Sequence, residues 1–174
     1  MGAEPLLDLG AIDLSACVHD REEIGLFNPH RGEVALLDRI VWHDDACDFG
    51  VAVKHVRDDE WWVGGHIPGM PLMPGVLMVE AGAQLSSFLY YKRSGQTWFA
   101  GFTRIEETTF RGHVVPGDDL YIVCKSEKYQ LKRFITRVQG FVNGEVCFDS
   151  KITGMAFPKL GVVRDEQGAD VMAR

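Results

Sequence analysis

Residues 65–80 read GHIPGMPLMPGVLMVE, and within this stretch a loop rich in glycine and proline runs into an apolar helix. The loop over 64–74 holds three glycines and three prolines, a density that excludes regular secondary structure. Pro74 suits the first turn of a helix, where its missing N–H costs nothing. Residues 75–93 contain no proline and are mostly Ala, Leu, Met and Val, so we predict a helix of roughly 18 residues that is buried on most faces. A basic last turn and Gly95 would end it.

Two ionisable side chains lie in this stretch, His66 in the loop and Glu80 in the helix. A carboxyl group among apolar neighbours is costly to bury unless it gains a partner or a proton. The loop histidine offers such a partner, because an imidazole exchanges its proton near neutral pH. We therefore predict that His66 and Glu80 form an acid/base pair and that this pair carries the chemistry of the protein.

Strand-like runs lie on both sides of the helix. The runs before it cover 34–42 and 48–56, joined by a turn at 43–46, and those after it cover 98–102, 106–110, 120–124, 134–142 and 146–155. An Asn-Gly turn within 142–145 joins the last two. One buried helix among antiparallel strands indicates an α+β domain in which a curved sheet wraps around the helix.

Composition narrows the classes of protein that fit. A chain of 174 residues is typical of one domain, and its net charge of −7 argues against a general nucleic-acid binder. The four cysteines form no CxxC pair and have no zinc-finger spacing, so we expect a reduced, cytoplasmic protein. We predict no secretory signal and no membrane-spanning segment, because no apolar run approaches the ~20 residues needed to cross a bilayer.

Four segments of the chain match one known family in order. They are Pro29-His30-Arg31 with the following LLDRI at 36–40, the GHIPGMPLMPGVL stretch with Glu80 and Gln84, the FAGF run at 99–102, and Phe110-Arg111 with VVPGD at 114–118. The chain thereby resembles the 3-hydroxyacyl-[acyl-carrier-protein] dehydratases of type II fatty acid synthesis, which have the hot-dog fold. The match covers 28–157, which leaves residues 1–27 as an N-terminal extension and residues 158–174 as a loose polar tail.

The resemblance implies dehydration of a (3R)-3-hydroxyacyl-[acyl-carrier-protein] to the trans-2-enoyl product without a cofactor or a metal. His66 would remove the α-proton, and Glu80 would act as the acid or position a water. The Gly75 N–H at the helix start would stabilise negative charge on the thioester oxygen. The substrate tunnel would be lined by Ile67, Pro74, Val76, Phe99, Ala100 and Gly101.

The family also places the histidine and the carboxylate of one site on different subunits. The resemblance therefore implies a homodimer with shared active sites, and it allows a trimer of dimers. It further implies an acyl-carrier protein as partner. Related bifunctional dehydratase-isomerases carry Asp at the position of Glu80, which favours dehydration without isomerisation here. The chain departs from the family at Ile67, where Phe is usual, and at Gly112-His113.

The remaining charged residues have simpler interpretations. We take the other histidines as structural: His19, His30, His43, His55 and His113. A cluster of basic residues is either a solvated strand face or a docking patch for an acidic carrier protein. Its members are Lys125, Lys128, Lys132, Arg133 and Arg137, of which Lys128, Lys132 and Arg133 are the docking candidates.

Two other functions fit the same fold. An acyl thioesterase also binds acyl thioesters along the central helix, and a non-catalytic acyl-binding protein would use the same tunnel. The pairing of His66 with Glu80 favours the dehydratase over both. The sequence leaves open the acyl chain length, the choice between carrier protein and coenzyme A, and the pathway.

Overall fold

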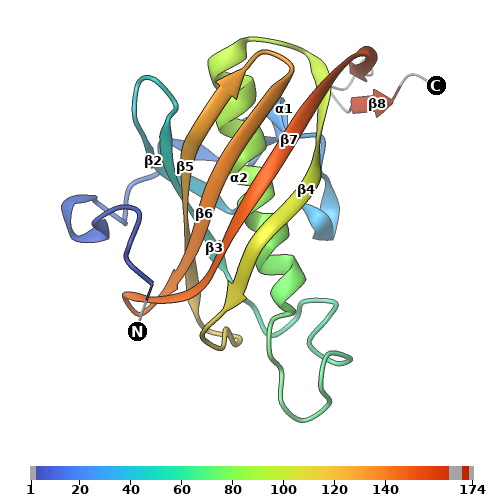
Figure 1. Ribbon diagram of the computed structural model, residues 1–174. Helices are drawn as coiled ribbons and strands as arrows, with labels where there is room; N and C mark the ends of the chain where they lie inside the picture. The colour runs from blue at the N-terminus through green and yellow to red at the C-terminus, as the bar shows by residue number, and fades with distance from the viewer. Residues whose placement is uncertain (1–2, 165–169, 173–174) are drawn as a thin grey trace.

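The computed structural model describes residues 3–164 and 170–172. One antiparallel sheet has the strand order β1-β2-β3-β5-β6-β7-β4, and β8 pairs with β7. The strands are β1 (His19–Asp20), β2 (Arg39–His43), β3 (Phe49–His55), β4 (Trp98–Phe110), β5 (Asp119–Gln130), β6 (Arg133–Val142), β7 (Glu145–Arg164) and β8 (Asp170–Met172). The sheet curves around the long helix α2 (Gly75–Ser94), and the short helix α1 (Arg21–Phe27) packs beside it (Figure 1). The predicted α+β hot-dog fold is confirmed.

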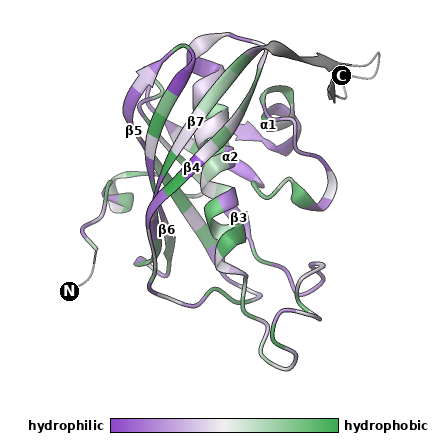
Figure 2. Cartoon of the chain, turned by 45° about the vertical axis from the view of Figure 1, so that its right-hand side comes forward, coloured by the Kyte–Doolittle hydropathy of each residue, from purple (hydrophilic) through white to green (hydrophobic). Residues whose placement is uncertain are grey.

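Helix α2 is the centre of the core, as its apolar sequence predicts. Thirteen of its twenty residues are buried, and Phe88 and Leu85 are fully enclosed. Apolar residues recur along the helix and on the strands around it (Figure 2). Gly95 adopts a left-handed conformation with φ 62°, and its N–H donates to the Tyr91 carbonyl at 2.9 Å. A helix end of this kind favours glycine, so the predicted stop is confirmed.

Two strand predictions are wrong in their extent. The runs at 98–102 and 106–110 form one continuous strand, β4, because the polar residues between them sit at register shifts near Phe102 and Glu106 rather than in a turn. The run predicted over 34–42 begins as a strand only at Arg39. Residues 32–34 form a short 3₁₀-helix, and Leu36 and Leu37 are buried in the core as an irregular segment.

The C-terminal segment also differs from its prediction. Strand β7 continues past residue 158 to Arg164, and residues 170–172 form β8. A loose tail is therefore the wrong description of these two stretches, while residues 165–169 and 173–174 lie outside the described residues. The backbone of these stretches pairs with β4 and within the β7–β8 pair, which makes them strands.

Residues 4–14 of the N-terminal extension lie against the outer face of the sheet, whereas its residues 19–27 form β1 and α1. Gln139 on β6 fixes the outer segment, since its Oε1 accepts from the Leu6 N–H at 2.8 Å and its Nε2 donates to the Glu4 carbonyl at 3.0 Å. Apolar side chains of the extension cover a small cluster on this face formed by Val41, Val51, Val53, Val123 and Phe141. The extension thus removes apolar surface from water on the side of the sheet opposite α2.

Candidate active site

Glu80 lies in the second turn of α2, and two polar groups hold its carboxylate. Gln84 Nε2 donates to Glu80 Oε1 at 2.9 Å, and His30 Nε2 lies 3.1 Å from the same oxygen. The Glu80 side chain is 26% exposed. The sequence predicts an apolar setting for this carboxyl group, with His66 as its partner. Within this single chain the loop before β2 brings His30 to Glu80, and the pairing of Glu80 with His66, which the resemblance places across two subunits, stays a prediction.

Gln84 is locked in a single orientation by the backbone around it. It is buried, its Oε1 accepts from the Leu36 N–H at 2.9 Å, and its Nε2 donates to the Val34 carbonyl at 2.8 Å as well as to Glu80. If the amide oxygen and nitrogen of Gln84 were exchanged, the nitrogen would face the Leu36 N–H, and the oxygen would face the Val34 carbonyl and the Glu80 carboxylate. All three hydrogen bonds would then be lost. The irregular segment before β2 therefore determines that Gln84 presents an N–H donor to Glu80.

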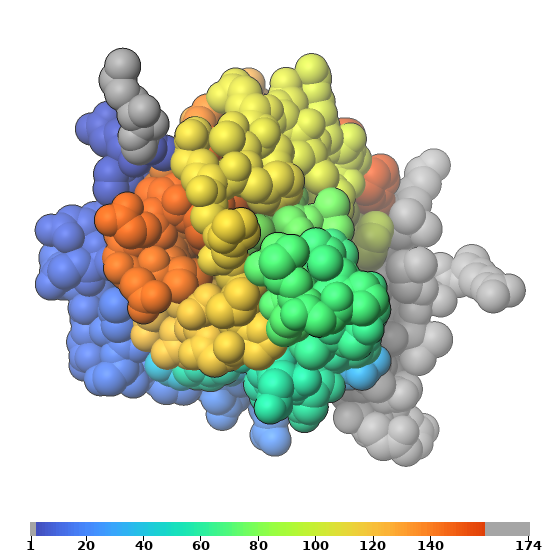
Figure 3. Space-filling view, turned by 90° about the horizontal axis from the view of Figure 1, so that it is seen from below, coloured from blue at the N-terminus to red at the C-terminus, as the bar shows by residue number. Residues whose placement is uncertain are grey.

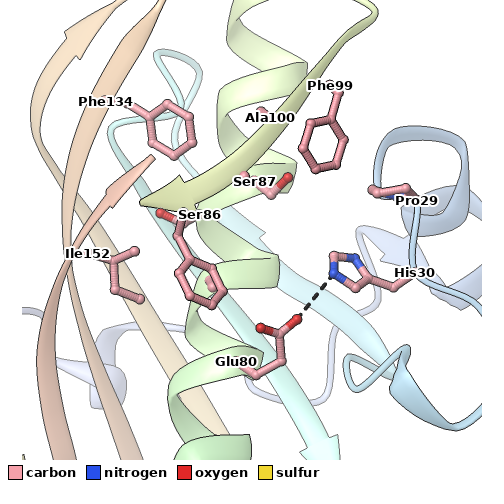
Figure 4. A pocket seen from close by; sticks show the side chains of 12 residues that line it. Pro29, His30, Glu80, Ser86, Ser87, Phe99, Ala100, Phe134 and Ile152 are labelled. Carbon is pink, nitrogen blue, oxygen red and sulfur yellow. Dashed lines mark ion pairs between the residues drawn. The ribbon is translucent and has the colours of Figure 1, made fainter. Parts of the chain in front are cut away.

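A cavity of about 240 Å³ opens beside Glu80, between α2, β4 and the loop that carries His30 (Figure 4). Its wall is mostly apolar, and its polar or charged side chains are those of Glu80, His30, Ser86 and Ser87. It is lined by Pro29, His30, Glu80, Ala83, Ser86, Ser87, Phe99, Ala100, Gly101, Phe102, Phe134 and Ile152. A cavity of this kind suits an apolar chain that ends in a polar, reactive group.

Three of the six residues predicted to line a tunnel are in this wall. Phe99, Ala100 and Gly101 come from the first residues of β4. Ile67, Pro74 and Val76 do not line the cavity of this single chain. Ile67 is 42% exposed and Val76 is 72% exposed, so in the single chain both face solvent at the surface.

His66 stands on the exposed loop that precedes α2. Its backbone N–H donates to the Trp62 carbonyl at 2.8 Å, and its Nδ1 lies 2.7 Å from the Leu72 carbonyl. A carbonyl only accepts, so Nδ1 carries the proton and Nε2 presents a free lone pair. That tautomer is the one a general base requires. The loop extends beyond the N-terminal end of α2 (Figure 1), and His66 is not among the residues that line the Glu80 cavity.

A buried ion pair anchors this loop to the sheet. Lys54 Nζ on β3 lies 2.8 Å from Glu60 Oε1, and the two side chains are 4% and 5% exposed. Glu60 Oε2 accepts from Trp62 Nε1 at 3.0 Å, and its Oε1 accepts from the Arg57 N–H at 3.0 Å. Burial works to raise the pKa of Glu60, but these donors together hold it below its usual value. The same Trp62 supplies the carbonyl that receives the His66 N–H.

Gly75 is the first residue of α2, directly after Pro74. Its N–H therefore belongs to the first turn, where amides have no acceptor within the helix. A Cβ at this position would lie 2.7 Å from the Phe110 ring, too close for any side chain. The Met73 N–H donates to the Val114 carbonyl at 2.8 Å, which ties the end of the loop to the turn after β4. Seen from below, the loop lies at the surface beside this turn (Figure 3).

The three docking candidates are far from Glu80. Lys128, Lys132 and Arg133 are exposed on the hairpin between β5 and β6. The Tyr90 hydroxyl donates to the Leu131 carbonyl at 2.6 Å, so this hairpin lies near the C-terminal end of α2. Ten residues of helix separate Tyr90 from Glu80, or about 15 Å. Arg137, another member of the basic cluster, pairs with Glu107 and Glu127.

Of the residues missed by the sequence analysis, His30 is the important one. It lies in the Pro29-His30-Arg31 motif, which carried the resemblance but which we interpreted as structural. Within residues 3–164 and 170–172 there is no cluster of three or more His, Cys, Asp or Glu side chains that could hold a metal ion. No helix in the same ranges is long and apolar enough to cross a membrane.

Comparison with known proteins places this chain in a family. The model of the FabA-like domain matches residues 28–151. A 3-hydroxyacyl-[acyl-carrier-protein] dehydratase FabZ of Nitratidesulfovibrio vulgaris is 36% identical over 136 residues, which cover 76% of this chain and 87% of that protein. The FabZ of Lawsonia intracellularis is 35% identical over 138 residues, which cover 76% and 88%.

Solved structures agree on the fold. A chain of the dehydratase heterocomplex ApeI:P from Xenorhabdus doucetiae superposes with a TM-score of 0.66 at 12% identity and covers 83% of this chain and 93% of that one. Cj0977, a virulence protein from Campylobacter jejuni, superposes with a TM-score of 0.63 at 15% identity and covers 84% and 96%. At such low identity these likenesses concern the fold alone.

Proposed function

We infer that this chain, which belongs to the FabA-like domain family, is a 3-hydroxyacyl-[acyl-carrier-protein] dehydratase of fatty acid biosynthesis. It removes water from a (3R)-3-hydroxyacyl thioester and leaves the trans-2-enoyl thioester. The observation that supports the assignment to His66 and Glu80 is the hydrogen bonding of their side chains. The His66 ring presents a free Nε2 lone pair, and the Glu80 carboxylate has one oxygen held and one free.

His66 is the base in this proposal. Its Nε2 takes the proton from the α-carbon of the thioester. The Nδ1–H remains on the Leu72 carbonyl throughout, at 2.7 Å, and this contact stabilises the imidazolium that forms. The electrons of the broken C–H bond become the new double bond between the α- and β-carbons.

Glu80 is the acid. In the reacting state its side chain is the neutral acid with a proton on Oε2, and it delivers this proton to the hydroxyl on the β-carbon, so that the C–O bond breaks, water leaves and the side chain becomes a carboxylate. The enzyme then holds a proton on His66 and a charge on Glu80, and exchange with solvent restores the starting state. The Gly75 N–H stabilises the negative charge that develops on the thioester oxygen, because an amide in the first turn of a helix lacks an intrahelical acceptor.

The active site is shared between two copies of the chain. In one chain His66 does not line the cavity of Glu80, which supports a site to which two chains each supply one of the two groups. Strand β4 offers the contact surface. It ends the sheet, it is thirteen residues long, and it exposes Phe102, Ile105 and Phe110. An open edge with apolar side chains favours pairing with another strand, and the partner's loop would bring Ile67, Pro74 and Val76 to the tunnel.

The reaction is tested with a trans-2-enoyl thioester, whose absorbance disappears when water adds across the double bond. We expect hydration by the wild-type protein, and a loss of about 10²- to 10⁴-fold in His66→Ala and in Glu80→Ala. Variants that keep their circular dichroism spectrum but lose activity support the assignment. Release of free thiol would identify a thioesterase instead, and no reaction at any chain length would identify a binding protein.

Mixing the two inactive variants tests the shared site. A mixed dimer of His66→Ala and Glu80→Ala chains contains one complete site if the two groups come from different chains. Unfolding and refolding an equal mixture should then recover about a quarter of the wild-type activity, since half of the dimers are mixed and each has one site of two. Activity that stays at the level of either variant alone contradicts a shared site.

The remaining assignments concern partner and compartment. We place the enzyme in the cytoplasm, because its four cysteines are free, and we assign docking of the acidic carrier to Lys128, Lys132 and Arg133 on the β5–β6 hairpin. Lys128→Glu with Lys132→Glu should raise KM for the carrier-bound substrate and leave KM for a small thioester unchanged. Equal KM values for the carrier-bound substrate in the wild type and the double variant would remove this hairpin from the docking surface.

A further inference from the structure

His30 is held close to Glu80 by a rigid segment of backbone. The buried Asn28 donates through its Nδ2 to the Gln84 carbonyl of α2 at 2.8 Å. Arg31 Nη1 donates to the Asn28 and His30 carbonyls at 2.7 and 2.8 Å. The backbone on both sides of His30 is therefore tied down, and the ring lines the cavity beside Glu80 (Figure 4).

The two contacts of the Glu80 carboxylate fall on the same oxygen. Gln84 and His30 both meet Oε1, at 2.9 and 3.1 Å. Within the described ranges Oε2 has neither a hydrogen bond nor an ion pair with the protein. A carboxylate held at one oxygen by two neighbours loses its rotation and presents the other oxygen in a defined direction.

The surroundings of His30 also indicate which ring nitrogen carries a proton toward Glu80. Its Nδ1 is buried and has no hydrogen-bond partner in the part of the chain that the structure describes. Its Nε2 lies 3.1 Å from Glu80 Oε1, an oxygen that accepts a hydrogen bond. A proton on Nε2 therefore has an acceptor, and this N–H donates to Glu80 Oε1.

We propose that His30 is a positioning residue for Glu80: together with Gln84 it holds Oε1, so that Oε2 faces the substrate. This inference rests on the proposed dehydration. It adds a third residue to the site, one that acts through Glu80 and exchanges no proton with the substrate. It also explains why a histidine without a free, solvent-facing nitrogen lines the cavity.

The kinetic test compares three substitutions. His30→Leu keeps the bulk but removes the donor, and should lower kcat about 10- to 100-fold with little change in KM, because the carboxylate is then held by one contact. His30→Gln places an amide N–H near the position of Nε2 and should recover most of that loss. His113→Leu, at an exposed histidine, is the matched control and should behave as wild type. A wild-type kcat in His30→Leu, or no recovery in His30→Gln, overturns the proposal.

A second measurement does not depend on activity. In protein labelled with ¹⁵N at histidine, the His30 ring should show a proton on Nε2, and Glu80→Gln should shift its Nε2 signal. A ring protonated only at Nδ1, or one indifferent to Glu80→Gln, contradicts the proposal even if the enzyme is an active dehydratase. The expected spectrum in an inactive protein would leave the His30–Glu80 contact in place and reject the dehydration instead.

Discussion

The two halves of the candidate site are built in opposite ways. Glu80 stands on a buried helix, and the locked Gln84 side chain and the His30 ring hold its carboxylate from within the same chain. His66 stands on a loop whose residues 64–70 are all exposed, and its Nδ1 lies 2.7 Å from the Leu72 carbonyl. Glu80 lines a cavity formed within the single chain, whereas His66 is not among the residues that line it.

This difference indicates what each half contributes. A carboxylate that delivers a proton in a defined direction needs a rigid mount, which a helix in the core supplies. A base that reaches the substrate across a subunit boundary has to stand at the surface before the partner arrives. The exposed half is nevertheless anchored at its base, by the Lys54–Glu60 pair and Trp62. The predictions below test how far this contrast holds.

The largest effect is expected at that anchor. Glu60→Leu leaves the buried Lys54 without its partner and should lower the free energy of unfolding by about 3–5 kcal/mol. The double variant Lys54→Met with Glu60→Leu should recover most of this loss, since no charge is then left buried. Urea unfolding measures both. Asp59→Leu is the matched control, because it breaks the neighbouring exposed pair with Arg57 and should cost less than about 1 kcal/mol.

If Glu60→Leu lowers the free energy of unfolding by no more than Asp59→Leu, the ion pair does not anchor the loop that carries His66. The contrast between this loop and the rigidly held Glu80 is then larger than the structure indicates. If the stability falls as expected, the enoyl hydration rate of Glu60→Leu should fall with it at a temperature where the variant is folded. That result would link the ion pair to the placement of His66.

A smaller effect on the free energy of unfolding is expected from a change of pH, through His19, which packs against α2. Burial and the nearby Lys92 lower the pKa of His19 from its ordinary value of 6.5. The unfolded chain therefore binds more protons than the folded one as the pH falls below about 6.5, so the free energy of unfolding should decrease on acidification. His19 and His43 stack 5.6 Å apart, and both rings lie against Phe88 of α2.

Thermal melts at pH 7.5 and 5.5 measure this effect. His19→Gln should show a smaller drop in Tm between the two values than the wild type, while the control His113→Gln, at an exposed position, should show the full drop. An unchanged drop in His19→Gln would mean that the packing around α2 is insensitive to this ring, and that acid sensitivity arises elsewhere in the molecule.

The smallest effect is expected beside His66. Ile67 is β-branched and adopts φ 62°, a left-handed conformation that disfavours such side chains. Ile67→Asn should raise the stability by about 1 kcal/mol, because asparagine tolerates this conformation, whereas Ile67→Val should leave it unchanged. Midpoints of urea unfolding decide between them. A less stable asparagine variant would show that contacts of Ile67 with a partner chain outweigh the strain.

Local patterns predict most of the elements but not all of their limits. The proline and glycine residues at 74 and 95 mark both ends of α2, because each acts through its own backbone conformation. The runs at 98–102 and 106–110 are predicted as separate strands but form one strand with register shifts between them, because pairing with β7 continues across the break. The strand after 157 is missed for the same reason, because its pairing with β4 and β8 joins residues that are distant in the sequence or not marked by a local pattern.

Some features of the candidate site can likewise be predicted from local patterns, and others cannot. The amino-acid sequence by itself determined the helix, its glycine at residue 75, and the presence of His66 and Glu80 on one loop–helix segment, because local residue patterns carry these features. Only the tertiary structure decided the partner of Glu80. His30 is fifty residues away in the chain and reaches Glu80 only because Asn28 and the segment before β2 pack on α2. Such contacts depend on which surfaces the fold brings together, and no local sequence pattern shows that two residues fifty positions apart will meet.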